Sequence, residues 1–325
     1  MTILITGAAG FIGTNLTKKL LSVGHRVIGV DNFYSGSPEN IHLFAKNSRY
    51  QFIEHDIRKP LKIKEKIDQI YNLACPASPP RYQKDPLFTL ETSVLGIRTM
   101  LKLAQEHRAK LLQASTSEIY GNPLEHPQKE SYWGNVNPVG PRSCYDEGKR
   151  AAETFCYEYF NRGVDVRVIR IFNTYGPYMD PADGRVITNF INQALRNEDL
   201  TIYGDGRQTR SFCFINDLLA GMTKYMALEE RFFGPLNLGN PEEFTVSKLA
   251  QKILKLIPKS KSKIVYRPLP VNDPEKRKPD ISQARQLLGW EPKTKLEEGL
   301  EKTIKYYRVT IETLETREAL EALEA

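Results

Sequence analysis

Tyr145 and Lys149 lie four residues apart in the segment CYDEGKRAAE, which has a helical pattern. This spacing places both side chains on one face of a helix. A free tyrosine has a pKa of about 10 and is a poor base at neutral pH, but a nearby ammonium group stabilises the phenolate and lowers that pKa. The pair predicts a tyrosine base whose lysine partner also holds a cofactor ribose, with a plain amphipathic helix as the alternative.

A run of hydroxyl side chains ends in an acid in the segment QASTSEIYG, at Ser115, Thr116, Ser117 and Glu118. Thr116 would hydrogen-bond the same substrate oxygen that Tyr145 deprotonates. A carboxylate in a dry cleft is costly unless it is paired or used. Glu118 is therefore either a reacting group or a strand-end acid bonded to the local backbone.

The N-terminal segment ILITGAAGFIGTNL places Gly7, Gly10 and Gly13 in a GxxGxxG spacing between a strand and a helix that begins near Phe11. Small residues let the backbone approach a pyrophosphate, and the helix N-terminus supplies N–H donors. The next strand ends at Asp31, where an acid can accept hydrogen bonds from the hydroxyls of the adenosine ribose. No Arg or Lys follows in DNFYSGSPEN, so the pattern favours NAD over NADP.

Asp56 ends the third strand, in the segment EHDI. In this context it is expected beside the adenine. Taken alone, an acid at this position is more often a turn residue that caps a helix.

The elements that must position these residues alternate between strand and helix. Strand-like runs are ILIT, RVIGV, QFIEH, QIYNLA, KLLQAS and VRVIRI, with amphipathic stretches at 11–23, 86–107 and 145–162. This alternation predicts an α/β fold with a Rossmann-like, doubly wound parallel sheet and a smaller C-terminal α/β substrate domain. We expect residues 1–172, with 210–240 returning to them, to bind the cofactor, and 173–308 to form a smaller, discontinuous substrate domain that closes over the first. Residues 309–325 are a helical tail or an appended sequence.

Composition and charge restrict the class of protein. The 325 residues include 40% hydrophobic residues and carry a net charge of +7. Because the basic residues are dispersed, the charge favours an anionic small molecule over nucleic acid. The four cysteines have no paired or metal-like spacing, which predicts reduced thiols, no metal and a cytoplasmic protein. We expect no signal peptide and no membrane-spanning segment.

Several motifs together resemble the extended short-chain dehydrogenase/reductase superfamily, and within it the UDP-glucuronate decarboxylase (UDP-xylose synthase) family. The superfamily motifs are TGAAGFIG, STSEIYG and YDEGK, and the resemblance extends from residue 1 to about 308. The segments that carry the match to the family are ACPASPPRY (74–82), ASTSEIYG (114–121), NPVGPRSCYDEGKRAAE (137–153), RIFNTYGP (170–177), DGRVITNFI (183–191), YGDGRQTRSF (203–212), NLGNPEEFT (237–245), DPEKRKPDI (273–281) and LGWEP (288–292). Of these, the ACPASPP and RKPDI segments are the specific ones.

The resemblance implies NAD-dependent decarboxylation of UDP-glucuronate to UDP-xylose through a 4-keto intermediate, with NAD recycled. The implied catalytic residues are Tyr145, Lys149, Thr116, Glu118 and Arg277. Glu118 would destabilise the sugar carboxylate or order a water that protonates C5, while Arg277 would orient the carboxylate or take part in that protonation.

The binding residues form two groups. The cofactor group comprises Gly7, Gly10, Phe11, Ile12, Gly13, Asp31, Asn32, Phe33, Ser35, Gly36, Asp56, Ile57, Leu73, Ala74, Thr92, Ser115, Tyr145 and Lys149. The substrate group comprises Pro76, Ser78, Tyr82, Ser117, Asn173, Arg185, Val186, Tyr203, Arg210 and Arg277, with Tyr203 expected at the uracil and the arginines at the diphosphate. Each arginine has an alternative reading as an ordinary loop or surface charge.

Other functions stay open at this point. A 4-epimerase, a 4,6-dehydratase and a decarboxylase that releases the 4-keto pentose use the same scaffold. A dehydratase places an acid where Ser117 stands, and epimerases have small residues where Glu118 stands. A non-catalytic NAD-sensing or RNA-binding protein is a further class, which the intact Tyr145 and Lys149 disfavour. We also expect a homodimer formed by helices 86–107 and 145–162.

Overall fold

The computed structural model describes residues 1–268 and 276–324. Its central element is a seven-stranded sheet in the order β11-β6-β5-β4-β1-β2-β3, and every pairing in it is parallel. The strands are β1 (Thr2–Thr6), β2 (Arg26–Asp31), β3 (Tyr50–Glu54), β4 (Gln69–Asn72), β5 (Lys110–Thr116), β6 (Val166–Ile171) and β11 (Leu236–Leu238). The six strand-like runs of the sequence correspond to β1–β6, which confirms the predicted Rossmann-like sheet.

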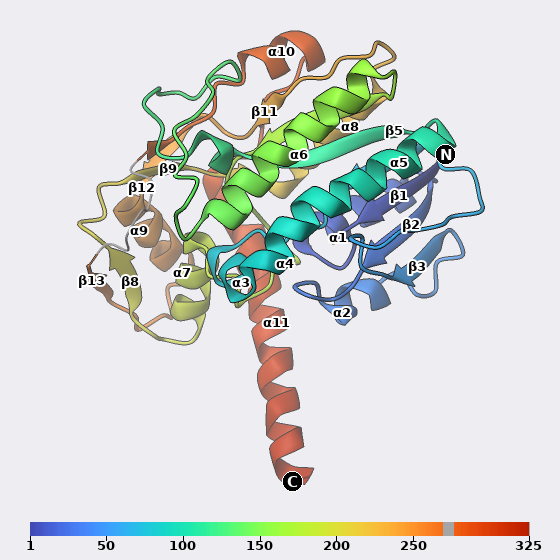
Figure 1. Cartoon of the computed structure of the whole chain (residues 1–325). Helices are drawn as coiled ribbons and strands as arrows, with labels where there is room; N and C mark the ends of the chain where they lie inside the picture. The colour runs from blue at the N-terminus through green and yellow to red at the C-terminus, as the bar shows by residue number, and fades with distance from the viewer. Residues whose placement is uncertain (269–275, 325) are drawn as a thin grey trace.

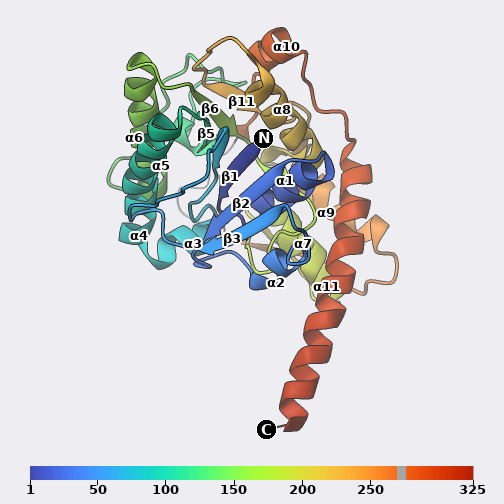
Figure 2. The ribbon, with the colours of Figure 1, turned by 90° about the vertical axis from the view of Figure 1, so that its right-hand side faces the viewer.

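Helices cover both faces of the sheet (Figure 2). One face packs on α1 (Phe11–Ser22) and α8 (Ile215–Ala227), and the other on α5 (Ile97–His107) and α6 (Ser143–Asn161). Successive side chains of a strand point to opposite faces. Accordingly Ile3 and Ile5 join the core beside α1, while Leu4 between them joins the core beside α5.

The predicted amphipathic stretch 86–107 is three elements instead of one helix. Helix α4 (Pro86–Glu91) leads into a π-helical turn, η1 (Thr92–Gly96), before α5. The Thr92 hydroxyl donates to the carbonyl of Phe88, four residues earlier. A Cβ on Gly96 would lie 2.6 Å from the Ile57 side chain, so the π-helical turn packs closely against the segment that follows β3. Such turns are frequent at functional sites.

A smaller group of elements lies beside the sheet (lower left in Figure 1). It contains α7 (Val186–Leu195), α9 (Val246–Leu256), and the parallel pair β8 (Leu200–Tyr203) and β13 (Ile264–Arg267). A three-stranded sheet joins β12 (Glu243–Thr245), β9 (Thr209–Ser211) and β14 (Lys276–Arg277), and a further parallel pair joins β7 (Thr174–Tyr175) and β10 (Cys213–Phe214). Between these segments the chain returns to the large sheet as α8 and β11.

Short helices complete the structure around the sheet edges. They are α2 (Pro38–His42), α3 (Pro79–Lys84), the 3-10 helix η2 (Ser117–Tyr120) and α10 (Ser282–Leu288). Residues 269–275, which include the first three residues of the DPEKRKPDI motif, and Ala325 lie outside the described residues.

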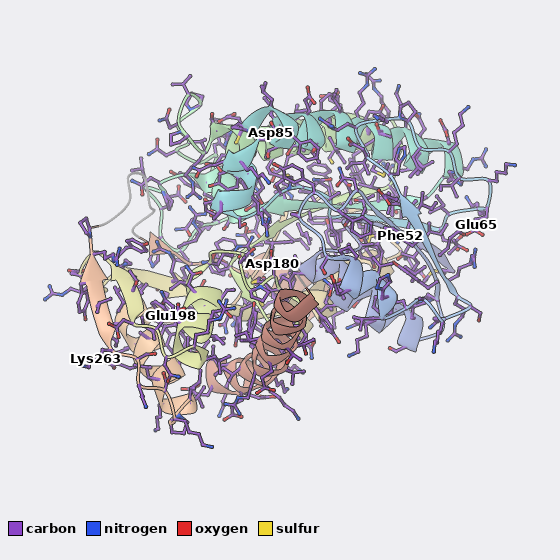
Figure 3. The ribbon with its side chains drawn as sticks, turned by 90° about the horizontal axis from the view of Figure 1, so that it is seen from below. Phe52, Glu65, Asp85, Asp180, Glu198 and Lys263 are labelled. Carbon is purple, nitrogen blue, oxygen red and sulfur yellow. The ribbon has the colours of Figure 1, made fainter. Side chains whose placement is uncertain are left out.

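The C-terminal helix α11 (Leu296–Glu324) packs on the body through its first turns and then extends away from it (Figure 1). It crosses residue 308 without a break, so the helix itself marks no boundary there. Figure 3 shows the molecule along α11. Glu198 and Lys263 lie on one side of this view, and Phe52 and Glu65 lie on the other, with Asp180 between them. The loop that contains Asp180 therefore runs along the junction of the two parts.

Candidate active site

A cleft of about 1190 Å³ opens at the carboxyl ends of the sheet strands. In parallel α/β sheets this edge is where ligands bind. Every residue that the sequence analysis selected for catalysis, cofactor binding or substrate binding lines this one cleft. Residues from the Gly7 turn to Arg277 are thus brought together by the ends of β1 to β6 on one side and by the smaller group of elements on the other.

The glycine-rich turn forms the floor of the cleft between β1 and α1. Gly7 has a φ of +69°, which favours glycine, and a Cβ on Gly13 would lie 2.1 Å from the Gly7 carbonyl oxygen. Gly10 precedes α1, and no side chain caps the helix there. The backbone N–H groups of the first helical turn can therefore receive a pyrophosphate, and these residues fit a dinucleotide.

Asp31 lies at the end of β2 beside this turn. Its carboxylate accepts hydrogen bonds from the Ala9 N–H at 3.0 Å and the Phe33 N–H at 2.8 Å. Burial raises the pKa of the Asp31 carboxyl, and these backbone donors oppose the rise. The carboxylate is fixed where an adenosine ribose would lie, and no cationic side chain bonds to it among the described residues.

We expect Asp31→Ala to weaken NAD binding by roughly 10- to 100-fold, because hydrogen bonds to a charged group contribute about 1.5–3 kcal/mol. The preference for NAD over NADP should narrow, since the variant no longer repels a 2′-phosphate. Titration of each cofactor against wild type and variant measures both effects. Equal affinity of the wild type for the two cofactors would show that Asp31 has been assigned incorrectly.

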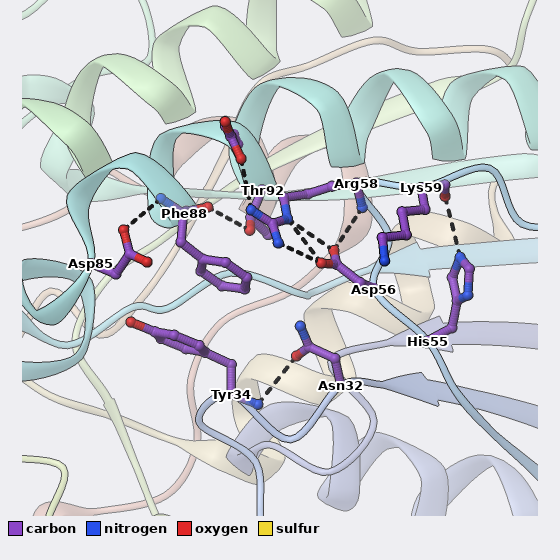
Figure 4. A network of polar contacts seen from close by, with 10 residues as sticks. Asn32, Tyr34, His55, Asp56, Arg58, Lys59, Asp85, Phe88 and Thr92 are labelled. Carbon is purple, nitrogen blue, oxygen red and sulfur yellow. Dashed lines mark hydrogen bonds and ion pairs between the residues drawn. The ribbon is translucent and has the colours of Figure 1, made fainter.

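Three side chains from three segments stack at the predicted adenine end of the cleft, which Tyr34 and Phe88 line. The Phe88 ring on α4 lies 4.2 Å from the Tyr34 ring and 4.3 Å below the Arg58 guanidinium. Figure 4 shows Phe88 between the other two groups. Arg58 also binds the Asp56 carboxylate through Nε and Nη2, and its Nη1 lies 2.7 Å from Glu91.

This arrangement gives Asp56 an ion-pair partner that sequence reasoning missed. Burial acts to raise the pKa of the Asp56 carboxyl, but its bonds with Arg58 outweigh burial and lower it. Asp56 lines the cleft as an acid already bonded to a cation, and the order Asp-x-Arg in a turn was the available signal.

We expect Phe88→Ala to weaken NAD binding by about 10-fold, because Phe88 lines the cleft and its contacts with Tyr34 and Arg58 fix the wall that the adenine would meet. Leu87→Ala is the matched control, since Leu87 is the neighbouring residue on α4 and is 72% exposed. NAD titration by calorimetry compares the two. The same affinity in both variants would remove the stack from cofactor binding.

Tyr145, Lys149 and Thr116 meet at the centre of the cleft. The Lys149 ammonium donates to the Ala114 carbonyl at 2.9 Å and lies 5.7 Å from the centre of the Tyr145 ring. The Tyr145 ring also stacks on Tyr82, with ring centres 5.1 Å apart. The spacing of Tyr145 and Lys149 along α6 therefore does bring both to the strand end that carries Thr116.

The pKa of Tyr145 differs from the expectation that Lys149 would lower it. Burial raises the pKa of the Tyr145 hydroxyl, and Cys75 adds to the rise. A hydrogen bond with the Thr116 side chain and the charge of Arg185 act in the opposite direction. The tyrosine is a phenol in this state, and it becomes a base only when positive charge beside it outweighs burial.

Glu118 is held between two guanidinium groups. Arg277 Nη1 lies 2.7 Å from one carboxylate oxygen, and Arg142 Nη2 bonds the other. Burial would raise the pKa of the Glu118 carboxyl, but Arg277 and Arg142 outweigh it and hold the pKa at about 2. Glu118 is therefore ionised at neutral pH and paired by side chains, which excludes the alternative of a strand-end acid bonded only to backbone.

Arg277 is buried, with 2% of its surface exposed, so the alternative that it is a surface charge is wrong. It also bonds the Ser117 hydroxyl at 3.3 Å and the Gly121 carbonyl at 2.9 Å. Arg142 was missed by sequence reasoning. Its signal was the spacing of three residues to Tyr145 and seven to Lys149, which places all three on one helix face.

The substrate-side residues surround the rest of the cleft. Arg185 donates to the Ala77 carbonyl at 3.0 Å and thus joins the loop before α7 to the ACPASPP segment. Arg81 and Asp180 form a second bridge between the same parts. Arg210 and Arg277 lie opposite each other in the pairing of β9 and β14. The cleft lining further includes Pro76, Ser78, Tyr82, Ser117, Asn173, Val186 and Tyr203, and also Gln208, Phe212 and Arg267, which sequence reasoning missed.

Two hydroxyls in this part of the cleft point to a ligand. Ser78 Oγ and Tyr82 Oη are buried and have no hydrogen-bond partner among the described residues. Buried polar groups are nearly always paired. Both were predicted substrate contacts, and a polar ligand in the cleft would satisfy them.

Comparisons with known proteins agree with this geometry. The model of the family described as GDP-mannose 4,6 dehydratase matches residues 4–303. UDP-glucuronic acid decarboxylase 1 of Danio rerio is 52% identical over 95% of this chain and 73% of its own length. UDP-glucuronic acid decarboxylase 6 of Arabidopsis thaliana is 49% identical over 96% of this chain and 90% of its own length.

A solved structure shares the whole architecture. UDP-glucuronic acid 4-epimerase from Bacillus cereus, in complex with UDP-glucuronic acid and NAD, superposes with a TM-score of 0.83 at 30% identity, covering 94% of this chain and 98% of that one. The epimerase shares the fold at lower identity, and the decarboxylases match at about half of all positions. The chain therefore belongs to the UDP-glucuronic acid decarboxylases, within the extended short-chain dehydrogenase/reductase superfamily.

Proposed function

We propose that this protein converts UDP-glucuronate to UDP-xylose and carbon dioxide, with NAD as a recycled cofactor. The observation that carries the proposal is the position of Glu118 between Arg142 and Arg277, in the same cleft as Tyr145, Lys149 and Thr116. Oxidation at C4 needs only the last three residues. Glu118 and its two arginines, which lie beside them, supply the charged groups that can hold the substrate carboxylate and promote its loss. The decarboxylase relatives agree with this assignment.

The first step is oxidation of the sugar at C4. Bound NAD supplies the acceptor for the C4 hydride and later returns it. Tyr145 removes the proton of the C4 hydroxyl, and Thr116 donates a hydrogen bond to the same oxygen. Lys149 stabilises the phenolate and holds the nicotinamide ribose.

The second step is loss of carbon dioxide from the 4-keto sugar, which is a β-keto acid. The bond between C5 and the carboxylate breaks, and its electron pair passes into the C4 ketone as an enolate. Tyr145 and Thr116 hydrogen-bond the developing oxyanion. Arg277 orients the carboxylate before it leaves, and Glu118 competes with it for the same guanidinium groups.

Two of the competing enzyme functions, the 4,6-dehydratase and the 4-epimerase, do not use this arrangement. A 4,6-dehydratase needs an acid at the position of Ser117, which here is a hydroxyl bonded to Arg277. A 4-epimerase needs no acid at Glu118. A decarboxylase that releases the 4-keto pentose uses the same groups, and the two decarboxylases differ in whether the keto sugar is reduced before it dissociates.

Incubation with UDP-glucuronate and NAD, followed by mass analysis of the nucleotide sugar, tests the proposal. We expect UDP-xylose and one equivalent of carbon dioxide, with no net reduction of NAD. A UDP-4-keto-pentose together with stoichiometric NADH would favour the alternative decarboxylase. A product that retains the carboxylate would overturn the decarboxylase assignment.

The two parts of the chain divide the binding. We propose that residues 1–172, with 210–240, bind NAD, and that 173–308 bind the nucleotide sugar. The contacts that support this are the glycine turn and Asp31 on one side, and Arg185 and Arg210 on the other. Thr310, at the start of the helical tail 309–325, also lines the cleft.

We further propose a cytoplasmic homodimer. Helices α5 and α6 lie side by side (Figures 1 and 2), and the adjoining surface exposes Leu87, Leu95 and Tyr157. A monomeric mass in solution scattering would contradict the dimer.

The four cysteines are free thiols, which suits a reducing compartment, and no helix among the described residues is long and apolar enough to cross a membrane. Recovery of the protein from an oxidising compartment would contradict the location.

A further inference from the structure

A second buried carboxyl, that of Asp146, lies beside the Glu118 ion pairs and has no role in the reaction described above. Asp146 follows Tyr145 on α6 and is 5% exposed. Its Oδ1 atom is buried and has no hydrogen-bond partner among the described residues. Its Oδ2 atom lies 3.9 Å from Arg142 Nε, on the same guanidinium whose Nη2 bonds Glu118. The two carboxyls therefore share one arginine.

Asp146 belongs to a buried group of four charged side chains, which has no net charge only if all four are ionised. Two carboxylates, Glu118 and Asp146, face two guanidiniums, Arg142 and Arg277. The other ionisable groups that act on Asp146, or on which it acts, are Glu147 and Cys144 on α6 and Tyr82 on α3.

Asp146 is the member of this group that gains a proton most readily. Burial raises the pKa of the Asp146 carboxyl to about 7, and the nearby Glu118 adds to the rise, while Arg142 and Arg277 oppose it. The pKa of Glu118 is held at about 2 by two direct ion pairs. Any further anion near the cluster raises the pKa of Asp146 more, because a like charge disfavours the ionised form.

The substrate supplies such an anion. This step rests on the proposed function, in which the C6 carboxylate of UDP-glucuronate approaches Arg277. The buried group then holds three carboxylates and two guanidiniums. An unpaired buried charge is costly, and uptake of one proton restores the balance.

The reaction also consumes one proton. A carboxylate leaves C5 as neutral carbon dioxide, its bonding electron pair forms the enolate, and C5 then takes one proton. One proton must therefore enter the site in each turnover, and Asp146 is a buried group that can take it up at the moment the substrate carboxylate arrives.

We propose that Asp146 is a positioning residue that binds a proton when the carboxylate of UDP-glucuronate enters the cleft, and so keeps Arg142 and Arg277 available to that carboxylate. When a group or water in the cleft has protonated C5, the proton of Asp146 passes to that group or water and restores it. The cluster then returns to two carboxylates and two guanidiniums, and the proton balance of the reaction is closed.

Proton uptake on binding tests the proposal in a protein that binds substrate but cannot oxidise it. Tyr145→Phe is that protein. Calorimetric titration of its NAD complex with UDP-glucuronate, in two buffers of different ionisation enthalpy slightly above neutral pH, gives the number of protons bound. We expect more than about half a proton per site, and close to none with UDP-glucose, which has a hydroxymethyl group in place of the carboxylate.

Adding Asp146→Asn to Tyr145→Phe should abolish most of the uptake with UDP-glucuronate. Glu158→Gln in the same background is the matched control and should keep it, because Glu158 lies on the same helix, is exposed and is not among the groups that act on Asp146. Unchanged NAD affinity shows that each variant is folded. Equal uptake in the Asp146→Asn protein and its parent overturns the proposal.

A second measurement needs no change at position 146. Infrared difference spectra of the Tyr145→Phe protein should show the band of a protonated carboxyl when UDP-glucuronate is added and none with UDP-glucose, and absence of the band overturns the proposal. If UDP-glucose binds but UDP-glucuronate does not, the proposed function itself fails. If UDP-glucuronate binds without proton uptake, only the role of Asp146 fails.

Discussion

Tyr145→Phe is expected to lower the rate of C4 oxidation by about 10²–10⁴-fold, the usual effect of losing one positioned acid–base group. The substitution removes one oxygen and leaves the ring, so the stack on Tyr82 at 5.1 Å should persist. NAD should still bind, since Lys149 keeps its bond to the Ala114 carbonyl. A single-turnover measurement at the NADH absorbance band should stay flat on addition of UDP-glucuronate.

The control for this variant is Tyr225→Phe. The Tyr225 hydroxyl donates to the Phe232 carbonyl at 2.7 Å and does not line the cleft, so its loss tests the general effect of removing a tyrosine hydroxyl. That variant should form NADH at close to the wild-type rate. Normal NADH formation in Tyr145→Phe would exclude Tyr145 as the base.

Glu118→Gln is expected to separate the two halves of the reaction. C4 oxidation does not use the carboxylate at position 118, so the variant should bind both ligands and form NADH. Glutamine has no charge, so Arg142 and Arg277 lose the partner that now bonds both of them. With both guanidiniums free to hold the substrate carboxylate, its departure as carbon dioxide should slow by about 10²-fold or more. NADH should then persist or decay slowly.

The decisive quantity is the ratio of carbon dioxide released to NADH formed in one turnover. Glu118→Gln should lower this ratio. Arg277→Ala should lower it for a different reason, because the carboxylate is no longer oriented for its departure, and it should also lower the affinity for UDP-glucuronate. Glu158→Gln is the control, because it removes an exposed carboxylate of α6 that does not line the cleft, and it should leave the ratio unchanged. Wild-type decarboxylation by Glu118→Gln would make Glu118 a structural acid and would strengthen the epimerase alternative.

The sequence alone predicted the features of the fold and the site that depend on interactions between residues close together in the chain. Strand runs such as VRVIRI and the alternation of strand and helix depend on side-chain pattern within a few residues, and they predicted the parallel sheet. Tyr145 and Lys149 share a helix face because of helical periodicity. Residue 13 must be glycine because a Cβ there would collide with the Gly7 carbonyl oxygen, which belongs to the same glycine-rich turn.

Where local rules failed, a tertiary contact decided the outcome. The helix predicted over 86–107 is interrupted by a π-helical turn, which also places Gly96 against Ile57 on another segment. Asp56 was predicted beside the adenine, and the prediction did not include Arg58, which folds back onto it and lies over the Phe88 ring of α4. The position of that ring depends on how α4 packs, which a pattern in residues 54–58 does not contain.

The decarboxylation half of the site depends most on tertiary structure. Residues Ser117 and Arg277 are 160 positions apart and meet because β14 joins β9 beside the end of β5. The resemblance suggested that Glu118 and Arg277 act together, but only the fold shows that Arg142 shares Glu118 and that Asp146 is buried behind the same guanidinium. A side-chain pKa depends on all charges within a few ångströms and on burial. The sequence therefore determined which acids are present. The tertiary structure determined that the pKa of Glu118 is lowered to about 2 and that the pKa of Asp146 is raised to about 7.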